Sequence, residues 1–312
     1  MNKPETISLY QFFKQFPDEE SARLYFEAKR WNAGKYCPHC GSLSVVECKD
    51  HKPMPYRCKD CRKHFSVRTG SVLEESRLPL QKWLMAIYMM TTARKGIPST
   101  QMAKELGITQ KSAWFLAQRI HEAWLTKDSG GEDGGGILGG ETEVDETFIG
   151  GKERNKHAAK RLRQGRCGVG IAIVVGAKQR GGRVVAKHVA DTSSSTFHGF
   201  IRENIAIGSC VYSDNFRSYN GLSHYFHNTV NHSVGEYVKH QVHTNGIESF
   251  WALLKRGYYG IYHHMSHKHL HRYVNEFSYR HNTANIGTME FIEATARKMN
   301  NKRLTYKELT NG

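Results

Sequence analysis

The spacing of apolar residues predicts helices in the first part of the chain and mostly strands in the second. A helical pattern follows Asp18, whose carboxylate suits a helix N-cap. Between residues 80 and 124 apolar positions again recur with helical spacing, and breaks at 96–99 and at Gly107 divide this stretch into three helices. Beyond residue 140 the apolar runs are short and rich in β-branched residues, which is typical of strands.

Four strands and one helix are predicted between residues 143 and 214. The strands are a run centred on Asp145, residues 167–177, residues 183–189, and residues 207–212 leading into Asp214. Glycines at 181–182 join the second and third strands as a hairpin, and residues 191–195 cap a helix before the fourth. This order, followed by a later helix, is that of an RNase H-like mixed sheet with flanking helices. In such a sheet, acids on the first and fourth strands lie side by side.

Two amphipathic helices are predicted in the last part of the chain, over residues 245–256 and 266–280. In the second of these, Glu276 and Arg280 are one turn apart. This spacing predicts a helical ion pair that contributes a few tenths of a kcal/mol.

Three acids that are distant in sequence are candidates for a shared metal site. Asp145 lies within a predicted strand, Asp214 ends another, and Glu248 lies on the helix over 245–256. Carboxylates that converge in this way favour magnesium or manganese, and two such ions support in-line phosphodiester chemistry. Lys255 follows Glu248 by two helical turns, so it shares that face of the helix and is predicted to contact DNA.

The charge of the chain favours a nucleic-acid partner. The net charge is +16 and the isoelectric point is about 9.5, as expected of a protein that neutralises phosphates. Seven basic residues fall within residues 152–166. Such a run is either a solvated face or a contact with the substrate, and its position directly after the Asp145 strand favours the substrate contact. Because the chain has no apolar run of about 18 residues and no signal peptide, we expect a cytoplasmic protein without membrane contacts.

Four of the seven cysteines predict a structural zinc site. Cys37 and Cys40 form one CxxC pair, Cys58 and Cys61 form a second, and 17 residues separate the pairs. This spacing, with strand-like residues around it, is typical of a zinc ribbon in which four thiolates leave no open position for chemistry.

The three helices between residues 80 and 124 have two possible interpretations. Two short helices joined through Gly107 match a helix-turn-helix, with the helix from about Gln110 reading a DNA groove. The alternative is a small helical bundle, and the net charge favours DNA binding. The patterns together predict a multidomain α/β protein with these segments: an N-terminal helix (1–32), a zinc ribbon (33–75), a helix-turn-helix domain (76–126), a glycine-rich linker (127–140), an RNase H-like catalytic domain (141–290) and a basic C-terminal segment (291–312).

Several motifs resemble those of one family. The motifs are Val-Asp-Glu-Thr-Phe-Ile-Gly-Gly-Lys at 144–152, Tyr-Ser-Asp at 212–214, Thr-Asn-Gly-Ile-Glu at 244–248 with Lys-Arg-Gly at 255–257, and His-Leu-His-Arg-Tyr at 269–273. With the two CxxC pairs, they resemble insertion-sequence transposases of the DDE type that carry an N-terminal zinc ribbon.

The resemblance implies a function and roles for individual residues. It implies that Asp145, Asp214 and Glu248 bind two divalent ions, with Asn245 as an alternative third ligand, and that Lys255 contacts DNA near the scissile end. It also implies metal-dependent cleavage at terminal repeats followed by strand transfer into target double-stranded DNA, by at least a dimer. The rival hypotheses are a regulator that binds DNA without cutting it, and a structure-selective nuclease without strand transfer.

Overall fold

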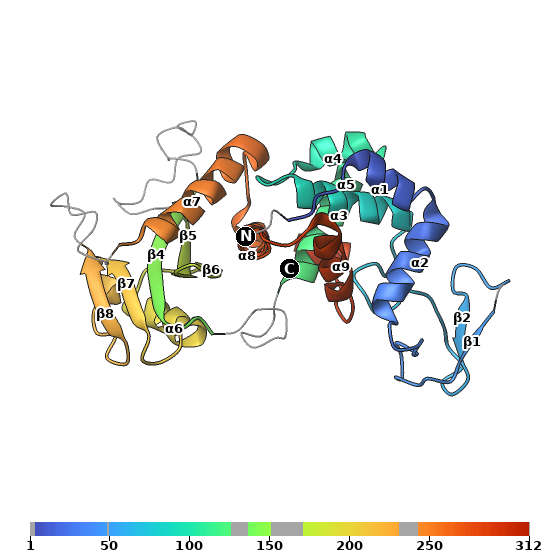
Figure 1. Ribbon diagram of the computed structural model, residues 1–312, viewed down its shortest axis with the longest axis horizontal. Coiled ribbons are helices and arrows are strands. Elements are labelled where there is room, and N and C mark those ends of the chain that lie inside the picture. Colours follow the sequence, from blue (N-terminus) through green and yellow to red (C-terminus); the bar gives the residue numbers. More distant parts are fainter. Residues whose placement is uncertain (1–3, 49, 126–136, 151–170, 231–242, 312) are drawn as a thin grey trace. The chain divides into compact units, whose positions relative to one another are not determined.

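The computed structural model describes residues 4–48, 50–125, 137–150, 171–230 and 243–311 (Figure 1). The chain divides into two compact units. The first comprises residues 1–125 together with 285–312, and the second comprises residues 126–284.

The first unit begins with two short helices, α1 (Leu9–Gln15) and α2 (Glu19–Arg30). The prediction of an N-cap at Asp18 is confirmed, because its side chain accepts the backbone N–H of Ser21 and the Ser21 hydroxyl oxygen accepts the backbone N–H of Asp18. Reciprocal bonds of this kind satisfy two backbone donors that a helix start leaves unpaired. Helix α1, which the sequence did not predict, has Ser8 as its N-cap, and Ser8 and Gln11 form a similar reciprocal pair of hydrogen bonds.

The ribbon is a three-stranded antiparallel sheet of very short strands. These are β1 (Val45–Glu47), β2 (Tyr56–Cys58) and β3 (His64–Phe65), with β2 in the centre. Its small apolar core consists of the rings of Trp31, Tyr56 and Phe65, which pack at centroid distances of 5.5–6.0 Å. A sheet of this size buries little apolar surface, so it needs a further source of stability.

The three predicted helices of residues 80–124 are confirmed. They are α3 (Leu80–Thr92), α4 (Ser99–Leu106) and α5 (Gln110–Trp124). Gly107 ends α4 with φ = 58°, a left-handed conformation that glycine adopts without steric cost. Thr109 then caps α5 by accepting the backbone N–H of Ser112.

The C-terminal residues belong structurally to this first unit, whereas the sequence suggested a weakly patterned basic segment. They form α9 (Thr288–Lys298) and α10 (Tyr306–Asn311). Thr295 accepts a 3.0 Å bond from the Trp124 indole, and the ammonium group of Lys302 donates to three carbonyls at the end of α5. The last carbonyls of a helix have few or no partners within the helix, and here the carbonyl of Glu122 also accepts the backbone N–H of Leu125, so the lysine stabilises the end of α5.

The second unit is built on a five-stranded mixed sheet with the order β6-β5-β4-β7-β8. Its strands are β4 (Glu141–Ile149), β5 (Ala172–Gln179), β6 (Val184–Val189), β7 (Cys210–Asp214) and β8 (Phe226–Val230). Strands β4, β5 and β6 are antiparallel neighbours, while β4, β7 and β8 run parallel. This confirms the predicted RNase H-like arrangement, and β8 is a strand that the sequence pattern did not reveal.

Helices cover both faces of this sheet. Helix α6 (Ser194–Asn204) packs its phenylalanines against alternate residues of β4 and β5 on one face. Helices α7 (Asn245–Gly257) and α8 (His267–Asn282) cover the other face, joined through the π-helical turn η5 (Tyr258–Tyr262) (Figure 1). The face under α7 carries the candidate catalytic residues.

The predicted ion pair of Glu276 and Arg280 in α8 is present, but both side chains are buried, so the predicted contribution of a few tenths of a kcal/mol is too small. The side chain of Glu276 is fully buried, accepts bonds from Arg280 at 2.8 and 3.0 Å, and also accepts the hydroxyl of Tyr262. Breaking a buried pair leaves an uncompensated charge and typically costs about 3–5 kcal/mol. The reason for the difference is η5, which folds Tyr262 over this part of α8.

Candidate active site and zinc site

Asp145 and Asp214 are brought together by the pairing of β4 with β7. The paired residues of β4 and β7 end with Glu143 and Tyr212, and Asp145 and Asp214 each follow two residues later on their strands. The charge of Asp214 acts on the pKa of Asp145, so the two acids are neighbours. Successive side chains alternate between faces, so both acids point to the α7 side of the sheet. Burial is the main cause that raises the pKa of Asp145 to about 7, and the nearby charges of Glu146 and Asp214 contribute to the same rise. Such a crowded pair of acids fits a bound cation.

Helix α7 is held closely against Asp145 by Trp251. The Trp251 indole donates a 2.9 Å hydrogen bond to the Asp145 carboxylate. Its ring lies over Gly176, the residue opposite Asp145 on β5, and a Cβ added at Gly176 would lie 2.6 Å from the ring. A side chain at position 176 would therefore push α7 away from the acids.

Glu248 and Asn245 both lie exposed in the first turns of α7, and Lys255 is half-buried two turns after Glu248. The Glu248 carboxylate accepts a 2.9 Å hydrogen bond from the hydroxyl of Thr244. Among the described residues, only the ribbon cysteines form a group of three or more potential metal ligands with all ligand atoms within 4.8 Å of one another. Glu248 therefore lies on the helix that covers Asp145 but is not drawn into a closed three-acid cluster.

Two further acids near Asp145 were not identified from the sequence. Glu146 faces the α6 side, accepts the Tyr219 hydroxyl at 2.8 Å, and has its pKa raised by burial. Glu143 faces α7 and is only 2% exposed. Strand alternation alone places Glu143 on the same face as Asp145, and this was the available signal.

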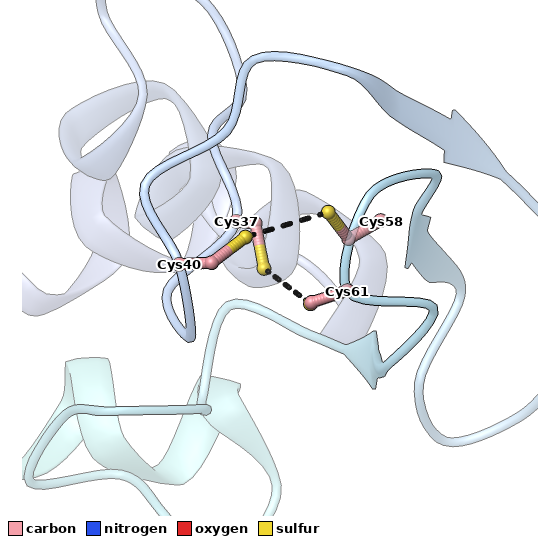
Figure 2. A group of neighbouring side chains, drawn as sticks. All are labelled: Cys37, Cys40, Cys58 and Cys61. Carbon is pink, nitrogen blue, oxygen red and sulfur yellow. Dashed lines mark hydrogen bonds between the residues drawn. The ribbon is translucent and has the colours of Figure 1, made fainter.

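The zinc-site prediction concerns four cysteines on two loops, and the structure brings all four together. Figure 2 shows Cys37 and Cys40 on one loop facing Cys58 and Cys61 on the other. The sulfurs of Cys37 and Cys61, and those of Cys40 and Cys58, are 3.6 Å apart. A zinc ion with Zn–S bonds of about 2.3 Å needs tetrahedral sulfurs about 3.8 Å apart, so this arrangement fits zinc. The backbone N–H of Cys61 lowers the pKa of Cys58 to about 7, which favours the thiolate that zinc binds.

The predicted groove-reading helix α5 exposes mainly its first turn. Gln110 and Lys111 are exposed, whereas most residues from Ala113 onward are buried. Arg119, which the pattern placed on this helix, is 4% exposed, donates to the carbonyl of Glu74 and stacks over Trp83. Recognition helices contact bases with their N-terminal residues, so the exposed turn is compatible with that role.

Two predicted features fall outside the described residues: the basic stretch at 152–166, and the part of the glycine-rich linker before residue 137. Residues 137–140 are described, and Leu138 there is buried in a parallel bridge with Ile205. None of the helices in the described part of the chain has the length and apolarity that a membrane crossing requires.

A ribbon with a four-cysteine site and an RNase H-like sheet with adjacent acids define a multidomain α/β protein. Residues 17–64 match the model of the transposase zinc-ribbon domain, and residues 137–282 match that of the ISXO2-like transposase domain. The chain belongs to the family of DDE-type insertion-sequence transposases that combine these two domains.

Relatives of known sequence are similar along much of their length. An uncharacterized protein in the transposable element ISH50 of Halobacterium salinarum is 30% identical over 258 residues, which cover 78% of this chain and 84% of that protein. An uncharacterized transposase-like protein of Haemophilus influenzae is 33% identical over 100 residues, covering 31% of this chain and 80% of that protein. The crystal structure of a pre-cleavage Mos1 transpososome aligns over 69% of this chain and 78% of that chain with 9% identity and a TM-score of 0.19, which is too low to support an argument.

Proposed function

We propose that the protein binds the terminal repeats of an insertion sequence, cleaves the DNA at these ends and joins them to target DNA. The observation that supports this proposal is that Asp145 and Asp214 are neighbours just beyond the paired residues of β4 and β7, in a unit whose helix α7 bears Glu248 and in a chain of the transposase family. Phosphoryl transfer depends mainly on positioning and on stabilising charge, and carboxylates held on a rigid sheet and helix supply the required framework.

The residues around this site have distinct proposed roles. Asp145, Asp214 and Glu248, or Asn245 in place of Glu248, would hold divalent magnesium or manganese ions. When bound, such ions polarise the scissile phosphate and lower the pKa of an attacking water. The Trp251 indole orients the Asp145 carboxylate through its 2.9 Å bond, and we assign to Lys255 a contact with the DNA backbone near the scissile end.

The first unit would supply most of the DNA binding. We assign end recognition to the zinc ribbon, with its ion held by the four cysteines, and to the exposed first turn of α5. Phosphate contacts by a chain with a net charge of +16 add sequence-independent affinity. We further propose that at least two copies act together when two transposon ends are joined.

The test is a cleavage assay on labelled double-stranded DNA that carries the inverted repeats flanking the coding sequence. With magnesium, we expect a cut at the transposon end and, on adding target DNA, a joined product. Cutting without any joined product would favour a structure-selective nuclease. Binding to the repeats with no cutting, under conditions where the protein is folded and zinc-loaded, would favour a DNA-binding regulator and contradict the proposal.

The pKa of Asp145 predicts how metal binding depends on pH. A divalent ion must displace the proton that Asp145 retains below about pH 7, so Mn²⁺ should bind about tenfold more weakly near pH 6 than near pH 8. In the metal-free protein the folded-state pKa exceeds the ordinary value of 3.8, so protonation of this group favours folding, and that contribution is lost as pH rises from about 4 to 7. Calorimetric Mn²⁺ titrations across this range check the first effect, and an affinity that does not vary with pH would contradict it.

A further inference from the structure

Glu143 is a buried carboxylate to which the chemistry proposed above gives no role. It is 2% exposed and lies two residues before Asp145, on the same face of β4. A buried charge is costly unless hydrogen bonds or opposite charges compensate it, so the partners of Glu143 indicate what it does.

The partners of Glu143 lie at the start of α7 and at the end of β5. One carboxylate oxygen accepts the backbone N–H of Ile247, the third residue of α7, at 2.9 Å. The other oxygen lies 3.2 Å from Nδ1 of His243 and 3.5 Å from Nε of Arg180. The same arginine also bonds Glu141 and stacks over an aromatic ring, so it is fixed in place.

Helix α7 has no side-chain cap of its own. Thr244 occupies the N-cap position but accepts no backbone N–H, and its hydroxyl donates to Glu248 instead. The first backbone N–H groups of a helix have no partner within the helix, and its positive end favours an anionic acceptor. Glu143 supplies that acceptor from a strand 104 residues earlier in the chain.

Gly246 makes this capping bond possible. A Cβ built at Gly246 would lie 2.7 Å from the Glu143 carboxylate oxygen, closer than real contacts allow. Glycine is otherwise unfavourable within a helix, so its presence in the first turn of α7 is explained by the close approach of the carboxylate. The Glu143 carboxylate and the missing side chain at position 246 therefore form a matched pair.

The geometry points to Glu143 as a positioning residue for the metal site, an inference that rests on the proposed function. Two bonds attach α7 to β4: Glu143 to the backbone of Ile247, and Asp145 to the indole of Trp251. Glu248 lies between these two attachments, directly after Ile247 and three residues before Trp251. By capping α7, Glu143 fixes where Glu248 stands relative to the acids of the sheet, and so sets the affinity of the site for divalent ions.

The test compares Glu143→Ala and Glu143→Gln in the zinc-loaded, full-length protein. Hydrogen exchange of the amides at 245–250 reports the cap, and the electron paramagnetic resonance signal of free Mn²⁺ reports metal affinity. In Glu143→Ala we expect faster amide exchange at the start of α7 and Mn²⁺ affinity reduced about 10- to 100-fold, the usual effect of losing a residue that orients metal ligands. Glu143→Gln keeps an oxygen that can accept the Ile247 N–H, so it should retain an affinity within about threefold of wild type.

A matched control and a second route to the same defect sharpen the test. Glu141→Gln removes a carboxylate on the same face of β4 that also pairs with Arg180 but has no bond to α7, so it should leave both readouts unchanged. Gly246→Ala should displace the Glu143 carboxylate and lower Mn²⁺ affinity, although alanine is the better helix former. Gly246→Ala retains every carboxylate, so it still tests the positioning role of Glu143 if the Glu143→Ala variant does not fold.

The possible failures are distinguishable. Wild-type amide exchange in Glu143→Ala would overturn the capping role, and faster exchange with unchanged Mn²⁺ affinity would overturn the positioning role. A Glu143→Gln variant as weak as Glu143→Ala would also contradict a role through the capping bond. If wild-type protein and Asp145→Asn bind Mn²⁺ equally, the proposed metal site itself fails and the positioning role fails with it, while amide exchange still reports on the cap.

Discussion

Replacing Asp145 or Asp214 by asparagine should reduce the rate of DNA cleavage by about a thousandfold or more. Metal-ion catalysis contributes several kcal/mol of transition-state stabilisation, and each 1.36 kcal/mol corresponds to about tenfold in rate. Asparagine preserves the size of the side chain but removes the charge that would hold the ions. Affinity for the terminal repeats should remain close to wild type, because we assign end recognition to the other unit of the chain.

The measurement is single-turnover cleavage of end-labelled repeat DNA in magnesium, with binding measured in calcium or without metal. Glu203→Gln is a suitable control, since Glu203 is an exposed carboxylate of the same unit that pairs with Lys187 at 3.0 Å. Its activity should match wild type. Cleavage that persists in Asp145→Asn or Asp214→Asn at more than about a tenth of the wild-type rate would refute the assignment of the catalytic acids.

The same assay can decide the third ligand. If Glu248 holds an ion, Glu248→Gln should lose cleavage to the same extent as the aspartate variants, while Asn245→Ala should lose much less. The opposite order would assign the role to Asn245. The structure leaves both on the first turns of α7, and the Glu248 carboxylate is bonded to Thr244, so the kinetics have to make the assignment.

Local patterns were sufficient to predict much of the architecture. The two CxxC pairs predicted the ribbon because metal ligands with fixed spacing constrain the chain strongly. Helices α2 to α5 followed from apolar periodicity together with end signals such as Asp18 and Gly107. The order of strands and helices between residues 143 and 256 was enough to predict the sheet, since few topologies accommodate it.

Features that depend on contacts between distant segments were not predictable in the same way. Strand β8 is the outermost strand next to β7, and three of its five residues are exposed, so it lacks the apolar signal of a central strand. Helix α8 carries the pair of Glu276 and Arg280, whose spacing looks like that of a surface pair. It is buried because η5 places Tyr262 against it, and nothing in the local sequence reports that.

The candidate site was likewise predictable in part, where local patterns were enough, and unpredictable where it depends on contacts between distant segments. The acids could be proposed from their positions within a strand, at the end of a strand and on an amphipathic helix, and the pairing of β4 with β7 brings the first two close to each other. Whether they bind ions stays a prediction. The capping of α7 by Glu143 was not foreseen, because the sequence shows only an acid in a strand and a glycine near the start of a helix about a hundred residues later.

The second large effect concerns the ribbon, where we expect one tightly bound zinc ion per chain. The ribbon has strands of only two or three residues and a core of a few rings, so its fold should depend on the ion. Structural zinc binding contributes about 10–16 kcal/mol in small domains, far more than such a core can replace. Cys37→Ser or Cys58→Ser should therefore lose the zinc and unfold residues 33–75, with rapid amide exchange and proteolysis confined to that region.

Cys48 provides the matched control for the zinc prediction, because it lies in the ribbon but is not one of the four clustered cysteines. Cys48→Ser should retain one zinc per chain by metal analysis and keep the exchange pattern of wild type. A wild-type protein that contains no zinc when purified without chelators would contradict the assignment, as would equal zinc loss in Cys48→Ser and Cys37→Ser. Because the ribbon is assigned to DNA recognition and the acids to cleavage, Cys37→Ser should weaken binding to the repeats while Mn²⁺ affinity at the acids is preserved. That outcome is the reverse of the one expected for Asp145→Asn, so the two variants together separate recognition from chemistry.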